Sequence, residues 1–216
     1  MADIQFSNNE IIIIGAGGLA REIVSWHNTS HNTNGRKIVG FLDDNLQALD
    51  GFKHDLKILG KINLDYVKKN QSVILAMADS VTKNILLGKL TELNIDIANF
   101  IHETCLIGQR TNYGKGFIML PYAIVSCDNK IGDLVLINCG SQIGHDVTIG
   151  NNTSIMANVD IGGGAKIGNN VFIGSGAVIL PSVNIPDNIR IGAGSVVIRS
   201  LKESGTYFGN PAKKIF

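Results

Sequence analysis

The 216-residue sequence has few cysteines, almost no net charge and no long apolar segment. Its three cysteines, Cys105, Cys127 and Cys139, form no CxxC pair, which favours buried thiols over disulfides or zinc ligands. A net charge of +1 without a long basic stripe argues against nucleic acid or an anionic membrane as a partner. The apolar run at residues 11–14 is too short to span a bilayer, and the first residues lack the pattern of a secretion signal. We therefore expect a cytoplasmic protein.

The most regular feature of the sequence is a six-residue repeat. Neither an amphipathic helix nor an alternating strand has this period. Repeats of six are typical of a parallel β-helix, in which each repeat is a short strand plus a turn and three repeats make one triangular coil. We expect the repeated aliphatic side chains to point into the prism and to stack from coil to coil. They are Ile131, Ile137, Ile143, Ile149, Ile155, Ile161, Ile167, Ile173, Ile179, Ile185, Ile191 and Val197.

The repeat extends backward, less regularly, through Val125, Met119 and Ile107. We therefore expect a prism of about five coils that begins soon after Ile101. Because a bare coil end is an unpaired strand edge, we also expect capping segments and association between copies.

Residues 1–101 follow another pattern and predict a Rossmann-like α/β domain ahead of a repeat domain at residues 102–216. Alternating strands and helices predict a small parallel sheet with right-handed crossovers. Asp79 and Ser80 suit the N-terminal cap of its second helix. The expected strands are residues 11–14, 37–42, 72–77 and 95–101.

The first of these strands runs into a glycine turn, residues 15–20, that matches the pattern G-x-G-x-x-A. Such a turn lets backbone N–H groups and a helix N-terminus approach phosphate oxygens, although it also occurs as a simple tight turn. Asp43 and Asp44 end the next strand, where carboxylates accept hydrogen bonds from a ribose or base, or lie in a solvated turn. The segment is too small for a full dinucleotide fold, so a mononucleotide or nucleotide-linked ligand fits it better than NAD.

His145 interrupts a repeat otherwise made of aliphatic, small and amide residues, and it lies near a corner of the predicted prism. One coil later the stacked residue is Gly163, which leaves space for a bound group. An imidazole can remove a proton from an attacking amine or hydroxyl, and Asp146 beside it would raise its basicity and fix its tautomer. The alternative is an exposed turn histidine beside a solvated aspartate, and the residues alone favour neither.

Several segments together resemble the sugar O-/N-acyltransferases of the bacterial PglD/NeuD family, which belongs to the hexapeptide-repeat superfamily. The resemblance covers nearly the whole chain. It implies a left-handed parallel β-helix, a homotrimer with active sites between subunits, acetyl-CoA in the groove between neighbouring prisms, and a nucleotide sugar held by the N-terminal domain. The segments are residues 11–18, Phe41-Leu42-Asp43-Asp44, the hexapeptide array with Asn138 and His145, and the tail Gly209-Asn210-Pro211-Ala212-Lys213.

The resemblance also implies roles for single residues. His145 would be the general base, and Asp146 would increase its basicity. The phosphate and sugar loop would be Gly17, Gly18 and Leu19, with Asp43, Asp44 and Ala78 around the nucleoside and Asn138 also at the substrate. The contacts of acetyl-CoA would be Ser154, Gly163, Ser175 and Ala193.

Two positions depart from the family pattern. Many relatives have histidine where this chain has Leu19, so one polar contact to the sugar is missing. Some have glutamate in place of Asp146, and the shorter side chain has less reach toward the imidazole. The spacing separately supports one assignment, because Ser175 and Ala193 are eighteen residues apart and stack on one corner, where a pantetheine arm can meet backbone groups. Small residues also occur at corners simply because turns favour them.

The expected activity is transfer of an acetyl group from acetyl-CoA to the 4-amino group of a UDP- or dTDP-linked 4-amino-4,6-dideoxy sugar, for surface glycan synthesis and without a metal. O-acetylation of a sialic acid or another sugar is the nearest alternative. A non-catalytic scaffold predicts no acetyl-CoA binding, and an NAD-dependent oxidoreductase predicts nicotinamide binding that the small first domain does not support. A β-helical carbonic anhydrase needs several zinc-binding histidines, whereas the repeat region has only His102 and His145.

Overall fold

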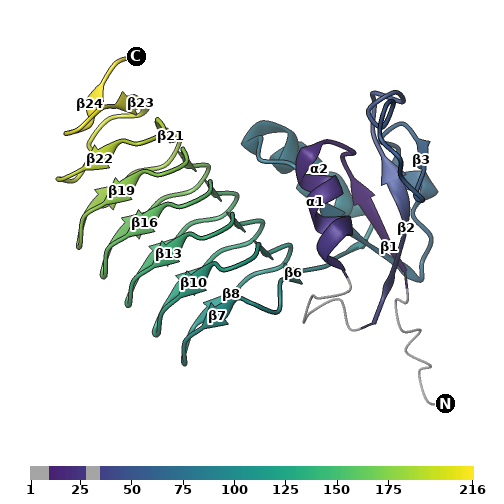
Figure 1. Cartoon of the computed structure of the whole chain (residues 1–216), viewed down its shortest axis with the longest axis horizontal. Coiled ribbons are helices and arrows are strands. Elements are labelled where there is room, and N and C mark those ends of the chain that lie inside the picture. Colours follow the sequence, from purple (N-terminus) through teal and green to yellow (C-terminus); the bar gives the residue numbers. More distant parts are fainter. Residues whose placement is uncertain (1–9, 28–34) are drawn as a thin grey trace. The chain divides into compact units, whose positions relative to one another are not determined.

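The computed structural model describes residues 10–27 and 35–216, which form two compact units (Figure 1). The first unit contains the described residues up to Met77 together with Val81–Phe100, and the second contains Ala78–Ser80 together with Ile101–Phe216. The short segment 78–80 therefore belongs with the repeats, although it precedes the last part of the first unit in sequence.

The first unit is built on a five-stranded parallel sheet with the strand order β3-β2-β1-β4-β5. Its strands are β1 (Glu10–Ile14), β2 (Lys37–Leu42), β3 (Ile58–Gly60), β4 (Gln71–Leu75) and β5 (Asp96–Ile97), and its helices are α1 (Gly18–Trp26), η2 (Leu64–Tyr66) and α2 (Ser80–Glu92). The four isoleucines of β1 are buried because a central parallel strand has no solvent-facing side. Since β1 pairs with both β2 and β4, the loops after β1 and β4 leave the sheet at neighbouring carboxyl ends.

The strand expected at residues 95–101 is wrong in part. The structure divides it into β5, which ends the first sheet, and β6 (Phe100–Ile101), which opens the second unit. Buried residues follow one another across this break, so hydropathy does not mark the change of sheet. The sequence also does not predict β3, because this edge strand has only three residues and none of them is buried.

The second unit is a parallel β-helix with three faces. Face 1 consists of β7 (Leu106–Ile107), β10 (Ile124–Val125), β13 (Gln142–Ile143), β16 (Asp160–Ile161), β19 (Val178–Ile179) and β22 (Val196–Val197). Face 2 consists of β8 (Asn112–Tyr113), β11 (Lys130–Ile131), β14 (Thr148–Ile149), β17 (Lys166–Ile167) and β20 (Asn184–Ile185). Face 3 consists of β6, β9 (Ile118–Met119), β12 (Leu136–Ile137), β15 (Ser154–Ile155), β18 (Phe172–Ile173), β21 (Ile189–Ile191), β23 (Gly205–Phe208) and β24 (Lys213–Lys214).

Three corners join these faces. In the coil that starts at β13, corner 1–2 is residues 144–147, corner 2–3 is residues 150–153 and corner 3–1 is residues 156–159. The fold class expected from the sequence is confirmed: a small Rossmann-like parallel sheet is followed by a left-handed parallel β-helix.

The repeated aliphatic residues form the core of the prism, as expected. All twelve from Ile131 to Val197 are buried, and the most exposed of them is Ile131 at 6%. Backbone hydrogen bonds hold the coils in register, because the N–H of Gly144 donates to the carbonyl of Ile161 at 2.8 Å and the same bond recurs in the next coils. Equivalent positions of successive coils are therefore eighteen residues apart.

The ends of the prism depart from the regular stack. Face 1 has six strands, one more than the about five coils expected. At the C-terminal end, β23 adds parallel to β21, and β24 folds back antiparallel onto β23. This hairpin pairs the last strand edge, so the structure has the expected capping segment at that end.

The three cysteines are free thiols in different surroundings. Cys105 is buried, and burial raises the pKa of its thiol to about 11. Cys127 and Cys139 are partly exposed, so the expectation of buried thiols holds for Cys105 alone. Within residues 10–27 and 35–216, no helix has the length and apolar character that crossing a membrane requires.

Replacing Ile161 with alanine should lower the free energy of unfolding by about 2–5 kcal/mol, because this side chain is fully buried between the isoleucines of two neighbouring coils. Chemical denaturation measures the change. The control is Lys166→Ala at an exposed position of β17, which should change the free energy by less than about 0.5 kcal/mol. Equal losses of unfolding free energy in both variants would contradict the view that the buried aliphatic residues of the repeats stabilise the prism.

Candidate active site

The glycine turn leaves an open space at the N-terminus of α1. Gly15 has a φ of +95°, which glycine adopts without strain, and its N–H donates to the carbonyl of Leu42. Gly17 caps the helix, which begins at Gly18. A Cβ added to either of these two glycines would meet no atom within 4 Å. The first N–H groups of α1 can therefore face a phosphate group, and Leu19, in the first turn, is only partly buried.

Asp43 and Asp44 support the loops around this turn. The carboxylate of Asp43 accepts hydrogen bonds from the N–H of Ala16 at 2.6 Å and from the N–H of Asn45 at 2.8 Å. The carboxylate of Asp44 accepts one from the N–H of Ile62 at 3.1 Å. A carboxylate has about four acceptor sites, so both groups retain capacity for a ligand hydroxyl or a base N–H.

His145 and Asp146 form a hydrogen-bonded pair at corner 1–2. Nδ1 of His145 lies 2.7 Å from Oδ2 of Asp146, so the shorter aspartate side chain does reach the imidazole. Asp146 has a φ of +59°, in the left-handed region that aspartate tolerates at turns. In the neutral imidazole this bond places the proton on Nδ1 and leaves the lone pair on Nε2. The pair therefore has the arrangement of a base whose tautomer is fixed by a carboxylate.

Gly163 makes room for the imidazole ring itself, which packs over this glycine. A Cβ at this position would lie 2.7 Å from Nε2 of His145, too close for contact. The stacking is direct, because the N–H of Gly164 donates to the carbonyl of His145 at 2.8 Å. Glycine at this corner is therefore required by the histidine below it.

The small residues expected at acetyl-CoA lie mainly at a different corner. Ser175 and Ala193 are exposed at corner 3–1, and the N–H of Gly194 donates to the carbonyl of Ser175, so they stack as predicted. Asn138 lies lower on the same corner, where its side chain accepts a hydrogen bond from the N–H of Cys139. Within one chain this column and His145 are at opposite edges of face 1.

Ser154 does not lie with Ser175 and Ala193. It is 1% exposed on face 3, and its hydroxyl donates to the carbonyl of Ala78 at 3.0 Å. Ser154, expected at acetyl-CoA, and Ala78, expected at the nucleoside, therefore contact each other. The next residues of that segment, Asp79 and Ser80, line a pocket of about 450 Å³ on face 3.

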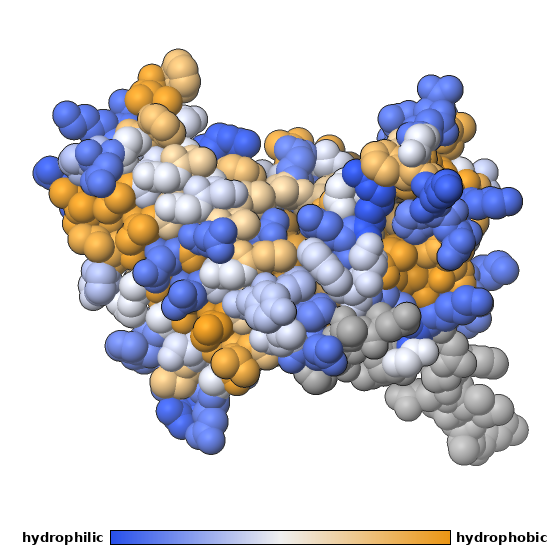
Figure 2. Space-filling view, viewed as in Figure 1, coloured by the Kyte–Doolittle hydropathy of each residue, from blue (hydrophilic) through white to orange (hydrophobic). Residues whose placement is uncertain are grey.

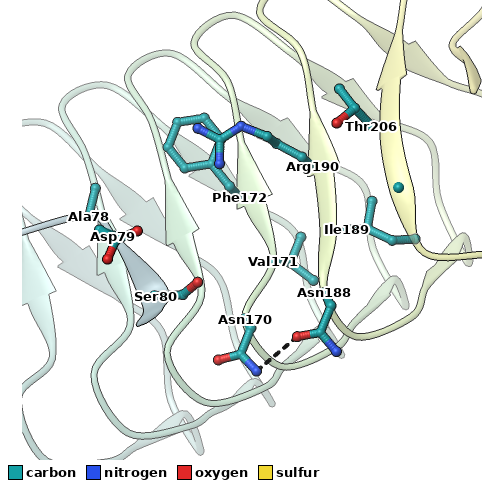
Figure 3. Close-up of a pocket in the computed structure, with 11 residues that line it drawn as sticks. Ala78, Asp79, Ser80, Asn170, Val171, Phe172, Asn188, Ile189, Arg190 and Thr206 are labelled. Atoms are coloured by element: carbon teal, nitrogen blue, oxygen red, sulfur yellow. Dashed lines mark hydrogen bonds between the residues drawn. The ribbon is translucent and has the colours of Figure 1, made fainter. Parts of the chain in front are cut away.

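Figure 3 shows this pocket, which lies on face 3 and contains neither His145 nor Asp146. The guanidinium of Arg190 lies over the ring of Phe172, 4.2 Å from its centre. At its edge, the side-chain amide of Asn170 donates to the side-chain oxygen of Asn188 at 3.1 Å. Ala78 is the one expected site residue in the lining.

Sequence reasoning misses the residues directly beneath the His145–Asp146 pair. Arg110 binds both carboxylate oxygens of Asp128, and the pKa of that carboxyl is lowered to about 2, chiefly by this hydrogen-bonded guanidinium. The buried side chain of Asn129 accepts a hydrogen bond from the N–H of Val147 at 2.7 Å and so holds the turn that carries the pair. The eighteen-residue spacing between Arg110, Asp128 and Asp146 is the signal that would reveal them.

Among the described residues, no three His, Cys, Asp or Glu side chains are grouped as a metal site would require.

Two family descriptions match the chain. Residues 10–90 match the PglD N-terminal domain. Residues 146–181 and 164–199 match the bacterial transferase hexapeptide, a family described by six repeats. A search of curated proteins finds no match.

Solved structures share the fold over nearly the full length. The acetyltransferase domain of PglB from Neisseria gonorrhoeae FA1090 is 22% identical with a TM-score of 0.86, and the match covers 96% of this chain and 100% of that one. A histidine-to-alanine mutant of GDP-perosamine N-acetyl transferase from Caulobacter crescentus, in complex with CoA and GDP-perosamine, is 24% identical with a TM-score of 0.85, over 94% of this chain and 95% of that one. WeeI from Acinetobacter baumannii AYE is 23% identical with a TM-score of 0.71, over 95% and 99%.

Replacing Gly163 with alanine should displace the imidazole of His145, because the new methyl group would overlap Nε2. The nuclear magnetic resonance signals of the ring report the displacement. The control is Gly88→Ala in α2, where an added Cβ meets nothing within 4 Å and the histidine signals should stay unchanged. Unmoved His145 signals in Gly163→Ala would show that the space beside Nε2 is larger than the structure indicates.

Proposed function

Because the chain joins a segment matching the PglD N-terminal domain to bacterial transferase hexapeptide repeats, we propose that it is an acetyl-CoA-dependent sugar acetyltransferase of the PglD type. Its acceptor is the 4-amino group of a nucleotide-linked 4-amino-4,6-dideoxy sugar, and its product is a precursor of a surface glycan. One observation carries this proposal. Nδ1 of His145 is hydrogen-bonded to the carboxylate of Asp146, and the ring is 66% exposed, so the Nε2 lone pair is available as a base.

His145 is the general base in this reaction. The acceptor nitrogen forms a bond to the thioester carbonyl carbon while Nε2 takes the proton of the amine. The carbon–sulfur bond then breaks, and the leaving sulfur takes the proton from the imidazolium to become the thiol of CoA. Asp146 stabilises the imidazolium through the hydrogen bond to Nδ1. Every proton transfer is made by protein side chains, so the step needs no metal.

The first unit supplies the features that suit a nucleotide-linked acceptor. The open N-terminus of α1 at Gly17 and Gly18 suits a diphosphate, and the free acceptor sites of Asp43 and Asp44 suit a ribose or base. In the second unit, Ala78 and Asn138 are the proposed substrate contacts, and Ser175 and Ala193 line the proposed path of acetyl-CoA. UDP and dTDP are the expected nucleotides. A GDP-linked sugar is a further acceptor to assay, because a structural relative was solved with GDP-perosamine.

A homotrimer would bring the two halves of the site together. His145 and the Ser175–Ala193 column border face 1 from opposite edges. If three copies pack around face 1, corner 1–2 of one copy meets corner 3–1 of the next, and acetyl-CoA lies between a histidine and a column from different subunits.

The surface of face 1 supports this packing. Its outward residues are the exposed Leu106, Ile124, Gln142 and Asp160, and the partly exposed Val178 and Val196, so four of the six are apolar. Figure 2 shows apolar surface over β19 and β22 and again over β7 and β10. Face 2 instead presents exposed polar residues, which are Asn112, Lys130, Thr148, Lys166 and Asn184. Face 1 therefore gains more than face 2 from being buried between copies.

Release of the CoA thiol from acetyl-CoA should require a UDP-, dTDP- or GDP-linked 4-amino-4,6-dideoxy sugar and should fall by about 10²–10⁴-fold in His145→Ala. The thermal midpoint of this variant should match the wild type, because the side chain is 66% exposed. Lys166→Ala is the activity control. Turnover with sialic acid alone would move the reaction to O-acetylation. Acetyl-CoA binding without turnover, unaffected by loss of His145, would contradict the catalytic proposal.

A mixing experiment tests the shared site. His145→Ala lacks the base, and Ala193→Trp blocks the column, so each variant alone should be inactive. Mixed trimers, made by refolding equal amounts together, should regain activity because about one third of their interfaces join an intact histidine to an intact column. No recovery in trimers of verified mixed composition would show that base and column act within one chain.

A further inference from the structure

An ion pair lies beneath the His145–Asp146 pair on the same corner. Arg110, Asp128 and Asp146 follow one another at intervals of eighteen residues, and their φ angles are +59°, +62° and +59°. The N–H of Asp146 donates to the carbonyl of Cys127, and the N–H of Asp128 donates to the carbonyl of Gln109. Three charged side chains therefore leave corner 1–2 from equivalent backbone positions on consecutive coils.

The geometry of the ion pair fixes the carboxylate of Asp128. Nε and Nη2 of Arg110 bind its two oxygens at 2.5 and 2.8 Å, the fork arrangement that orients a carboxylate most firmly. The same contact, helped by the thiol of Cys127, is the cause of the low pKa of Asp128, which keeps this group ionised at neutral pH. Asp128 is thus a negative charge one coil below the His145–Asp146 turn, directly beneath Asp146.

Neighbouring coils are separated by about 4.8 Å, the spacing of adjacent strands. From the coil below, Asp128 interacts electrostatically with His145. A carboxylate freed from its ion pair there could also compete with Asp146 for the imidazole N–H. The charged and titratable groups around His145 are Asp146 in its own turn, Cys127 directly below it, Asp128 below Asp146, and Arg110 one coil further down. The coil above contributes only Gly163 and Gly164 at this corner.

We propose that Arg110 and Asp128 are positioning residues for the base: Arg110 holds Asp128 away from the imidazole, so that Asp146 alone bonds Nδ1, while the charge of Asp128 favours the protonated ring. This role rests on the proposed function of His145 as the base. The competing explanation is that the ion pair only fastens two coils together. The two explanations differ in whether removing each charge changes the pH at which His145 takes up a proton.

The test is a titration of the His145 ring by nuclear magnetic resonance in the full chain, with the signal assigned from His145→Ala. Arg110→Met should move the titration midpoint to higher pH, because a nearby positive charge is lost, and Asp128→Asn should move it to lower pH. Each shift should be roughly 0.2 to 0.7 of a pH unit, the scale of an exposed charge pair. Arg110→Lys, which keeps the charge, should restore most of the wild-type midpoint.

Matched controls remove the same charges elsewhere. Lys166→Met lies on face 2, and Glu203→Gln breaks an ion pair with Lys214 at the C-terminal end of the prism. Both should leave the midpoint unchanged. If the titration midpoint of His145 shifts in the same direction in Arg110→Met and Asp128→Asn, or in neither, the proposal is overturned. The ion pair would then serve only to join the two coils. Thermal midpoints verify that each variant is folded.

The titration needs neither acetyl-CoA nor an acceptor, so its result is independent of the transfer assay. If the midpoint shifts in opposite directions in the two variants but the protein shows no transfer activity, the coupling of Arg110 and Asp128 to His145 stands and the proposed reaction is rejected. With transfer activity, the acidic limb of the pH profile of kcat/KM should follow the midpoint in each variant, upward for Arg110→Met and downward for Asp128→Asn.

Discussion

The hydrogen bond from each strand N–H to a carbonyl seventeen residues later is the constraint on which the second unit depends. It stacks every residue on the one eighteen positions before it, so a side chain always meets its counterpart of the previous coil. The inward position can then hold only one kind of residue, because an isoleucine packs well on another isoleucine and poorly on a gap or a polar group. The period of the sequence is a direct result of this packing.

The same register restricts which side chains fit at the corners of the β-helix. Thr111, Ser141 and Thr153 occupy inner corner positions, and each hydroxyl both donates to a carbonyl and accepts an N–H of the next coil. Asn129 holds the turn of His145 with a longer side chain. These buried polar groups are tolerated because their bonds are made within the corner. His145, with Gly163 above it and an ion pair in the coils below, is the corner residue to which we assign a catalytic role.

Much of this architecture follows from the residues alone. The isoleucine period predicts the prism, and simple addition of eighteen predicts that Gly163 follows His145 and that Ala193 follows Ser175. Other features depend on contacts between segments far apart in sequence. Nothing in the sequence near Ser154 shows that the carbonyl of Ala78 covers it, and the pattern around Asp43 does not reveal that its carboxylate is already bonded to Ala16. The eighteen-residue spacing between Arg110 and Asp128 could have predicted that they stack. Charged residues at turns are usually solvated, however, so the spacing alone does not indicate an ion pair.

The uniform register also limits how the chain can change in length. A single inserted residue inside a coil would move every later side chain off its column and turn the isoleucines outward. Eighteen inserted residues would add one complete coil and disturb nothing above it, and a loop that leaves and re-enters at one corner would also preserve the stack. The prism can therefore lengthen in whole coils or acquire loops at its edges. Because His145 and the Ser175–Ala193 column are separated by a set number of coils, an extra coil between them would shift one part of the proposed site by a full coil relative to the other.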